Sequence, residues 1–249
     1  DKFRIISSTM PTHNLLVILG PTATGKTRLA VALAFEQGGE IISADSRQVY
    51  RGLDIGAGKD LDEYTVNGQK VPYHLIDEVD LDQEFSVFDF QRRFYEVFDT
   101  VSARGVLPVL VGGTGLYLDS VLMEYNLVAV PENLMLRTEL SSLSFEELKL
   151  RLAQVKHLHN VSDFGSPERV IRAIEIATFQ KNHPAEVRPA LCPLIFGIQV
   201  EHQMLRQRIH DRLHIRLSQG LITEVEQLVK KGVSQERLDS LGLEYRYVM

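Results

Sequence analysis

Short continuous runs of hydrophobic residues alternate with longer amphipathic stretches along this chain. Four of the runs have the length and composition of buried strands, at residues 15–19, 40–44, 106–111 and 194–200. Helical patterns lie between them, and this alternation favours a parallel sheet that is covered by helices on both faces. The pattern therefore predicts an α/β fold with a parallel sheet flanked by helices.

Three helices have recognisable start signals, because a serine precedes an acidic residue by two or three positions in each: Ser86 with Asp89, Ser144 with Glu147, and Ser166 with Glu168 across Pro167. The first helix is expected to run to Ala103 and the third to Phe179. Residues 126–165 contain helix signals and no strand run. We therefore predict the first part of an α/β core at 10–125, a small helical insertion at 126–165, and a continuation of the core with C-terminal helices at 166–249.

Composition narrows the class of protein. At 249 residues, of which 44% are hydrophobic, the chain can bury a substantial core. It has no apolar run of about eighteen residues, and its first nine residues lack the uninterrupted apolar stretch of a signal peptide. A soluble cytoplasmic protein is therefore expected. The single cysteine, Cys192, excludes an intramolecular disulfide, and His210 and His214 lack a carboxylate partner for a metal. The formal net charge of −6 implies that any nucleic acid would be contacted through local patches.

The most specific motif is Gly20-Pro21-Thr22-Ala23-Thr24-Gly25-Lys26-Thr27, which lies between the first strand and a helical pattern. It fits the phosphate-binding loop G-x-x-x-x-G-K-[ST]. Backbone N–H groups of such a loop surround phosphate oxygens, the lysine adds positive charge, and the helix contributes its positive N-terminal end. The candidate phosphate-binding residues are Gly20, Thr22, Thr24, Gly25, Lys26 and Thr27. The hydroxyl of Thr27 is also the candidate ligand for Mg²⁺.

Two other strand ends carry candidate chemistry, because functional groups gather at the carboxyl edge of a parallel sheet. The second strand is followed by Asp45, Ser46 and Gln48, and the third runs into Gly112-Gly113-Thr114-Gly115. A nucleotide-hydrolysing relative would often carry a metal-binding aspartate at the end of the third strand, where this chain has a glycine turn and a threonine. Taken alone, Asp45 could equally bind a metal or cap a helix, and the glycine segment could be an ordinary turn.

A basic row follows one side of a C-terminal helical segment. Arg208, Arg212 and Arg216 recur every four residues, beside an apolar row at Leu205, Ile209, Leu213 and Leu217. An arginine that contacts phosphate is best sought in this segment. Charged rows on helices are usually solvated, and we expect this of Arg216 in particular. For Arg169 and Arg172, the sequence leaves open whether they contact phosphate or nucleic acid or have a structural role.

The order and spacing of these motifs resemble the tRNA dimethylallyltransferase family. The resemblance is carried by the phosphate loop and by residues 42–56, 74–77 and 111–117, and more weakly by residues 169–175, 208–217 and 220–225. It covers nearly all of the chain from about Leu15. One departure is Gly58, which separates Ala57 from Lys59 where family members commonly run directly from alanine to lysine. The role of Lys59 is therefore left open.

The resemblance implies a P-loop NTPase-like core that transfers a dimethylallyl group from dimethylallyl diphosphate to the N6 amine of an adenosine beside the anticodon of tRNA. By family position, Asp45 accepts the amine proton, Thr114 lines the reaction channel, and Arg212 contacts the diphosphate with support from Arg208. Ser46, Gln48 and Gly113 are further substrate-binding candidates. Mg²⁺ is the implied cofactor, the insertion would contact tRNA, and the protein is expected to be a monomer.

Alternative functions remain compatible with the same residues. An adenylate dimethylallyltransferase would use the same core to prenylate free AMP, ADP or ATP in cytokinin synthesis. A small-molecule kinase would need only the phosphate loop and would transfer phosphate from ATP. A nucleotide-gated binding module would not need Asp45 at all. The order of the motifs favours the tRNA enzyme.

Overall fold

The computed structural model describes residues 13–155, 165–183 and 188–248. The chain forms two compact units, one of residues 1–125 with 189–249 and the other of residues 126–188. The predicted start of the core at residue 10 lies outside the described residues. Each unit has a hydrophobic core of its own.

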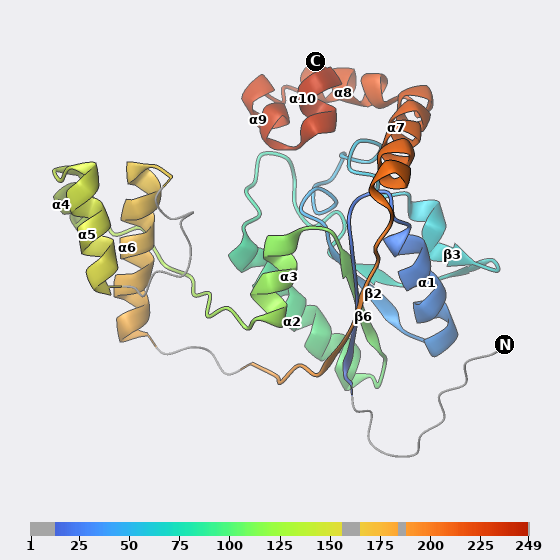
Figure 1. The fold of residues 1–249 in the computed structure, drawn as a ribbon, viewed down its shortest axis with the longest axis horizontal. Helices are drawn as coiled ribbons and strands as arrows, with labels where there is room; N and C mark the ends of the chain where they lie inside the picture. Colours follow the sequence, from blue (N-terminus) through green and yellow to red (C-terminus); the bar gives the residue numbers. More distant parts are fainter. Residues whose placement is uncertain (1–12, 156–164, 184–187, 249) are drawn as a thin grey trace. The chain divides into compact units, whose positions relative to one another are not determined.

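The first unit is built on a five-stranded parallel sheet (Figure 1). From one edge to the other its strands are β5 (Tyr73–His74), β2 (Glu40–Ala44), β6 (Pro108–Gly112), β1 (Leu15–Leu19) and β7 (Pro193–Gly197). The predicted strands at 15–19 and 40–44 have the predicted bounds. The register places Gly112 opposite both Leu19 and Ala44, so the three central strands end at the same level. The loops that follow these strands therefore share one edge of the sheet.

Helices cover both faces of the sheet, as predicted. On one face α2 (Val87–Ala103) and α3 (Gly115–Leu122) pack their aromatic and aliphatic side chains onto β1, β2 and β6. On the other face lie α1 (Lys26–Gln37), the 3₁₀ helix η1 (Leu61–Tyr64) and a small hairpin of β3 (Thr65–Val66) and β4 (Gln69–Lys70). The start signal of α2 is a true capping box, since Ser86 and Asp89 bond to each other's backbone N–H groups.

Four C-terminal helices complete this unit (Figure 1). They are α7 (His202–Gln219), α8 (Leu221–Lys230), α9 (Gln235–Ser240) and α10 (Leu243–Val248). Apolar side chains of α8, α9 and α10 pack on the segment that follows β2, chiefly Val49, Tyr50 and Leu53. The C-terminal helices are thereby joined to the carboxyl edge of the sheet.

The strand β7 differs from the prediction of a buried strand. Its side chains Leu194, Ile195 and Phe196 are 38–47% exposed. The reason is its position at the edge of the sheet, where it pairs with β1 and has no strand on its other side among the described residues. A continuous apolar run predicts burial on both faces, but it does not show which strand will lie at an edge.

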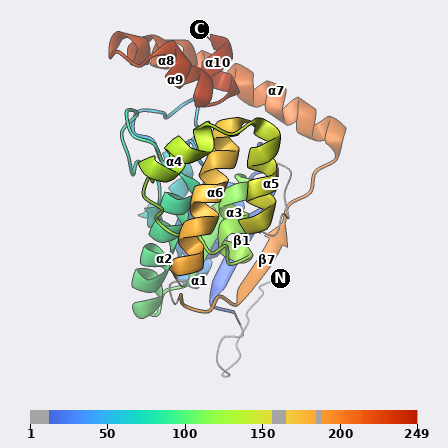
Figure 2. The same ribbon diagram turned by 90° about the vertical axis from the view of Figure 1, so that its left-hand side faces the viewer.

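The second unit consists of α4 (Leu134–Ser141), α5 (Phe145–Val155) and α6 (Pro167–Asn182), which lie side by side in Figure 2. The predicted boundary at 165 is wrong, because α6 belongs to this unit instead of to the core. Val170 and Ile174 of α6 pack against Leu148 and Leu152 of α5. Without α6, the two shorter helices would have no partner for this apolar face.

A buried carboxylate links the helices of this unit. The side chain of Glu175 on α6 is 1% exposed and accepts hydrogen bonds from Arg137, Arg172 and the backbone N–H of Asn133. Burial raises its pKa, but these bonds outweigh burial and lower the pKa of Glu175 to about 2. Arg172 also donates to the carbonyl of Val130, 2.9 Å away. Its observed partners are therefore structural.

Replacing Glu175 with glutamine should destabilise the second unit by about 2–3 kcal/mol at neutral pH, because two arginines lose their buried counter-charge. Since the folded pKa is depressed, the stabilisation by Glu175 is fully present above its unfolded pKa and is lost as the pH falls toward 2. Hydrogen exchange of the amides in α4–α6 would measure this. Glu139→Gln on the exposed side of α4 is the control, and equal protection in both variants would contradict the prediction.

Candidate active site

The loop between β1 and α1 is tightly curved, and its side chains bond to its own backbone. The dihedral angle φ is +61° at Ala23 and +81° at Gly25. Thr24 Oγ1 donates to the carbonyl of Pro21 over 2.8 Å, and Lys26 Nζ donates to the same carbonyl. Gly25 is the N-cap of α1, and no side chain bonds to the first N–H groups of that helix from this position. These N–H groups can therefore donate hydrogen bonds to an anion such as phosphate.

Gly20 has a different role from the rest of the loop. A Cβ atom at this position would lie 2.7 Å from the carbonyl oxygen of Ile198, and φ is +154°. Glycine is needed here because the end of β1 lies against the segment after β7. Gly20 does not line the cavity described next, so its contribution is to the packing that fixes the loop.

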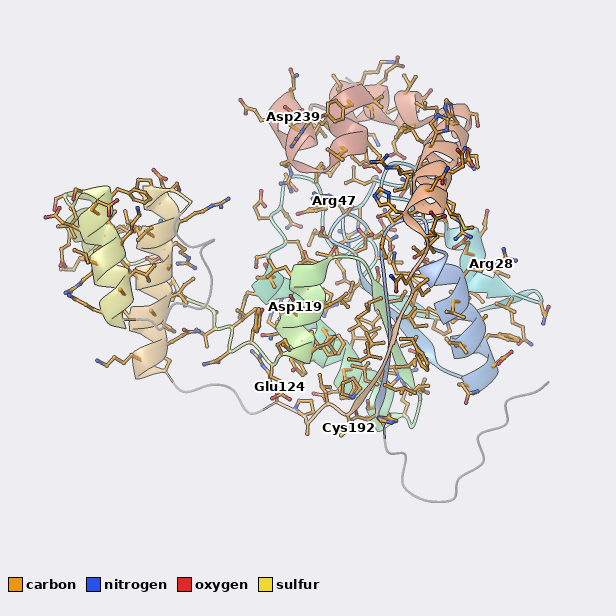
Figure 3. All side chains as sticks on the ribbon, in the orientation of Figure 1. Arg28, Arg47, Asp119, Glu124, Cys192 and Asp239 are labelled. Atoms are coloured by element: carbon orange, nitrogen blue, oxygen red, sulfur yellow. The ribbon has the colours of Figure 1, made fainter. Side chains whose placement is uncertain are left out.

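A cavity of about 650 Å³ lies at the carboxyl edge of the sheet, within the first unit. All of the predicted site residues except Gly20 line it, namely Thr22, Thr24, Gly25, Lys26, Thr27, Asp45, Ser46, Gln48, Gly113, Thr114, Arg208 and Arg212. Figure 3 labels Arg47 at this end of the sheet, in the loop after β2. Three loops and α7, far apart in sequence, therefore supply one site.

Asp45 and Thr114 line the same cavity because they follow β2 and β6, which pair with each other and end at the same level. A Cβ at Gly112 would lie 2.2 Å from the carbonyl oxygen of Ala44, so only glycine fits there. The backbone N–H of Ser46 donates to Thr114 Oγ1 over 3.0 Å. The N–H of Arg47 donates to Asp45 Oδ1 over 2.9 Å. One carboxylate oxygen of Asp45 is thus held by the backbone, and the other has no partner among the described residues.

The charge of Lys26 interacts with the charges of Asp45 and Arg212. Burial lowers the pKa of the Lys26 ammonium, the nearby carboxylate of Asp45 raises it, and the Arg212 guanidinium lowers it again. The phosphate loop, the acid after β2 and the arginine of α7 therefore act on one another. A bound anion would relieve the repulsion between the two cations.

Both polar atoms of the Gln48 side-chain amide form hydrogen bonds within the protein. Ser43 Oγ donates to its Oε1 over 2.9 Å, and its Nε2 donates to the carbonyl of Gly58 over 3.0 Å. The side chain lines the cavity but is nearly buried. These contacts favour a role in holding the segment 54–60 against the end of β2.

Lys59, whose role the sequence left open, is a buried structural cation. Its Nζ donates to the carbonyl of Tyr50 at 2.9 Å, to Asp54 at 2.8 Å and to Asp77. These carboxylates come from two of the segments that carry the family resemblance. A buried charge is stable only when it is paired, and here one lysine ties the two segments together.

The segment 54–58 is also held from α8 and α10. The carboxylate of Glu224 accepts the backbone N–H groups of Asp54, Ile55 and Gly56 at 3.2, 2.7 and 3.1 Å. The hydroxyl of Tyr245 donates to Glu224 over 2.8 Å and accepts the N–H of Ala57 over 3.0 Å. Four successive amides are therefore fixed by two side chains that lie 168–188 positions away in the sequence. No local sequence signal could have revealed these contacts.

Replacing Tyr245 with phenylalanine should keep the ring in place and leave the buried N–H of Ala57 without its acceptor, at a cost of about 1–3 kcal/mol. Hydrogen exchange at residues 54–59 should then become faster. The matched control is Tyr247→Phe on the same helix, since Tyr247 is 76% exposed. Unchanged exchange in the Tyr245 variant would show that Glu224 alone holds the segment.

The three arginines of the basic row on α7 have different environments. Arg208 and Arg212 line the cavity, and Arg212 Nη2 lies 3.4 Å from Asp60 Oδ2. The prediction that Arg216 is solvated is wrong, because its side chain is only 7% exposed. Its neighbours include the carbonyl of Gly56, in the segment after β2, and the carboxylate of Glu244 on α10. Its place in the same four-residue row as Arg208 and Arg212 was the signal that could have identified it.

Other candidate sites acquire no function from the structure. His210 and His214 are exposed neighbours whose Nε2 atoms lie 3.1 Å apart, and Cys192 is an exposed thiol. Across the described parts of the chain, no group of three or more histidine, cysteine, aspartate or glutamate residues could hold a metal. Within the same residues, no helix is long and apolar enough to cross a membrane.

A glycine-rich loop between the first strand and first helix, at the carboxyl edge of a parallel sheet, defines a P-loop NTPase-like protein. Comparisons with known proteins narrow this class. The model of the IPP transferase family matches residues 48–249. A tRNA dimethylallyltransferase 1 of Geotalea daltonii is 56% identical over 236 residues, which cover 94% of this chain and 76% of the relative. A tRNA dimethylallyltransferase 2 of Syntrophotalea carbinolica is 57% identical over 240 residues, 95% of this chain and 79% of the relative. The chain belongs to the tRNA dimethylallyltransferase family.

Solved structures agree with this assignment. The tRNA isopentenylpyrophosphate transferase of Bacillus halodurans is 33% identical with a TM-score of 0.62, over 92% of this chain and 77% of that chain. A eukaryotic dimethylallyltransferase acting on tRNA has a TM-score of 0.68 at 23% identity, over 90% of this chain and 59% of that chain, and shows the shared fold. The predicted family and fold class are confirmed.

Proposed function

We propose that this protein transfers a dimethylallyl group from dimethylallyl diphosphate to the N6 amine of an adenosine beside the anticodon of tRNA. The observation that carries the proposal is the meeting of Asp45 and Thr114 with the phosphate loop in one cavity. The names of the relatives favour this reaction over adenylate prenylation and over phosphate transfer. We also propose that the protein acts as a monomer in the cytoplasm, and that its helical unit contacts the tRNA.

Asp45 would serve as the base. The lone pair of the adenine amine is delocalised into the ring, so the amine becomes a useful nucleophile only as its proton is accepted. In the transfer, a bond forms between N6 and the allylic carbon that carries the diphosphate, while the bond from that carbon to the diphosphate oxygen breaks. The amine proton passes to the free carboxylate oxygen of Asp45, and the diphosphate leaves with the electron pair. Thr114, held by Ser46, would line the path of the incoming adenine.

The phosphate loop would bind the leaving group. Negative charge grows on the diphosphate as the carbon–oxygen bond breaks, and fixed positive groups stabilise that charge best when they are already in place. The free amides at the start of α1, Lys26 and Arg212 supply such groups. The allylic carbon gains cationic character at the same time, so excluding water from the cavity protects it from hydrolysis.

Thr27 fits a role in binding Mg²⁺. Thr27 lies in the first turn of α1 and lines the cavity. Mg²⁺ usually takes one or two protein ligands together with water and substrate phosphates, so a single hydroxyl beside the phosphate loop is compatible with it. Bound there, Mg²⁺ would neutralise charge on the diphosphate.

The function is tested by incubating the protein with radiolabelled dimethylallyl diphosphate and Mg²⁺, with unmodified tRNA and AMP as parallel acceptors. Label in tRNA is expected, and its loss on adding EDTA would support the role of Mg²⁺. Label in AMP alone would reassign the protein to adenylate prenylation. ATP-dependent phosphorylation without label transfer would indicate a kinase. Light scattering checks the expected monomer.

A further inference from the structure

Arg216 is a buried cation in the wall of the cavity. Its Nη1 donates to the carbonyl of Gly56 over 3.1 Å and lies 3.5 Å from Glu244 Oε1. Its Nη2 has no partner among the described residues. Among the described residues, Gln91 Oε1 is the one fully buried side-chain polar atom without a hydrogen-bond partner. Because Arg216 Nη2 also lacks a partner but is not in that class, it is not fully buried, and Arg216 lines the cavity. An N–H group of a buried guanidinium is therefore free to bind a ligand.

Gly58 makes room for this guanidinium. A Cβ atom at Gly58 would lie 1.8 Å from Arg216 Nη2 and 2.1 Å from Arg212 Nη2, and φ at Gly58 is +62°. Both nitrogens thus lie beside the same point of the backbone, less than about 4 Å apart, a distance at which two like charges repel. Any other residue would have to displace both arginines.

The charge of the pair is only partly neutralised. Asp60 lies 3.4 Å from Arg212 and Glu244 lies 3.5 Å from Arg216, both beyond the 2.7–2.9 Å of a strong charged hydrogen bond. Burial and the neighbouring Arg212 lower the pKa of the Arg216 guanidinium. Arg212 also opposes the charge of Lys26 in the phosphate loop. Arg212 therefore interacts electrostatically both with Lys26 of the phosphate loop and with Arg216.

We infer that Arg216 is a second guanidinium of the diphosphate site and forms with Arg212 a two-arginine clamp that Gly58 accommodates. This inference rests on the proposed function, since that function supplies the diphosphate. A group with several negative charges relieves the repulsion between the arginines and can accept N–H donors from both. The clamp acts on the leaving group as its charge increases during the transfer.

The test is calorimetric titration of the full chain with inorganic diphosphate and Mg²⁺ at fixed ionic strength. Arg216→Met should raise the Kd for diphosphate by about 10–100-fold, and Arg216→Lys should recover part of the affinity because it keeps the charge. Arg206→Met is the matched control on the same helix, since Arg206 is exposed and does not line the cavity. Equal Kd values for wild type and Arg216→Met would overturn the inference.

Gly58→Ala provides an independent arm. It should weaken diphosphate binding to a similar extent, because its methyl group occupies the space of both Nη2 atoms. Gly68→Ala is its control, since Gly68 has φ +76° and open space around the added atom, so it reproduces the backbone strain without the overlap. If Arg216→Met does not fold, Gly58→Ala decides, and normal binding by Gly58→Ala would then overturn the clamp.

The two hypotheses fail in distinguishable ways. If wild type binds diphosphate in an Arg216-dependent manner but transfers no label to tRNA, the clamp stands and the proposed reaction fails. If wild type labels tRNA while Arg216→Met binds diphosphate normally, the reaction stands and the clamp fails.

Discussion

Replacing Asp45 with asparagine should lower kcat for dimethylallyl transfer by about 10²–10⁴-fold, the usual worth of a positioned base, with little change in the KM for either substrate. Asparagine has nearly the same shape and keeps an oxygen that can accept the N–H of Arg47, as Asp45 Oδ1 does at 2.9 Å. It cannot accept the proton of the adenine amine. The loss should therefore appear in turnover and not in binding.

The matched control for this variant is Asp119→Asn. Asp119 lies on the exposed side of α3, outside the cavity (Figure 3). Single-turnover rates with saturating tRNA would separate the chemical step from product release. Normal single-turnover rates in the Asp45 variant would make the carboxylate structural, and the base would then have to be sought elsewhere in the cavity.

Local signals were sufficient for much of the fold and for the centre of the site. The strands β1 and β2, the capping box of α2 and the phosphate loop depend on short stretches of chain whose geometry is set by neighbouring residues. The parallel register then brings the ends of β1, β2 and β6 to one edge, so the sequence alone was enough to place Asp45 and Thr114 beside the loop.

Features that depend on distant packing were not predictable in this way. The apolar run of β7 looks buried although the strand lies at an edge. The helix α6 has an ordinary start signal that says nothing of which unit its apolar face will join. Arg216 has the spacing of a surface residue, yet it is buried against Gly56 and Glu244. Each of these depends on partners far away in sequence, as do the bonds of Glu224 to residues 54–56.

Replacing Lys26 with methionine should lower kcat/KM for dimethylallyl diphosphate by about 10²–10³-fold, because the developing charge on the diphosphate loses a preorganised cation. Methionine preserves most of the aliphatic stem, so the packing of the loop should change little. The hydrogen bond from Lys26 to the carbonyl of Pro21 is lost, but Thr24 still bonds to that carbonyl over 2.8 Å. Lys70→Met, on the exposed hairpin, is the control.

The pH profile makes this prediction specific to the charge of Lys26. Burial lowers the pKa of Lys26 from its ordinary value of 10.5, so the free enzyme should lose the charge at a lower pH than an exposed lysine would. The kcat/KM of wild type, which reports the free enzyme, should therefore fall on the alkaline side below pH 10.5, and the methionine variant should lack this limb. Wild-type kinetics in the variant would mean that the loop does not hold the leaving diphosphate. A reduced rate that retains the alkaline limb would show that another group titrates, and that Lys26 contributes through the geometry of the loop.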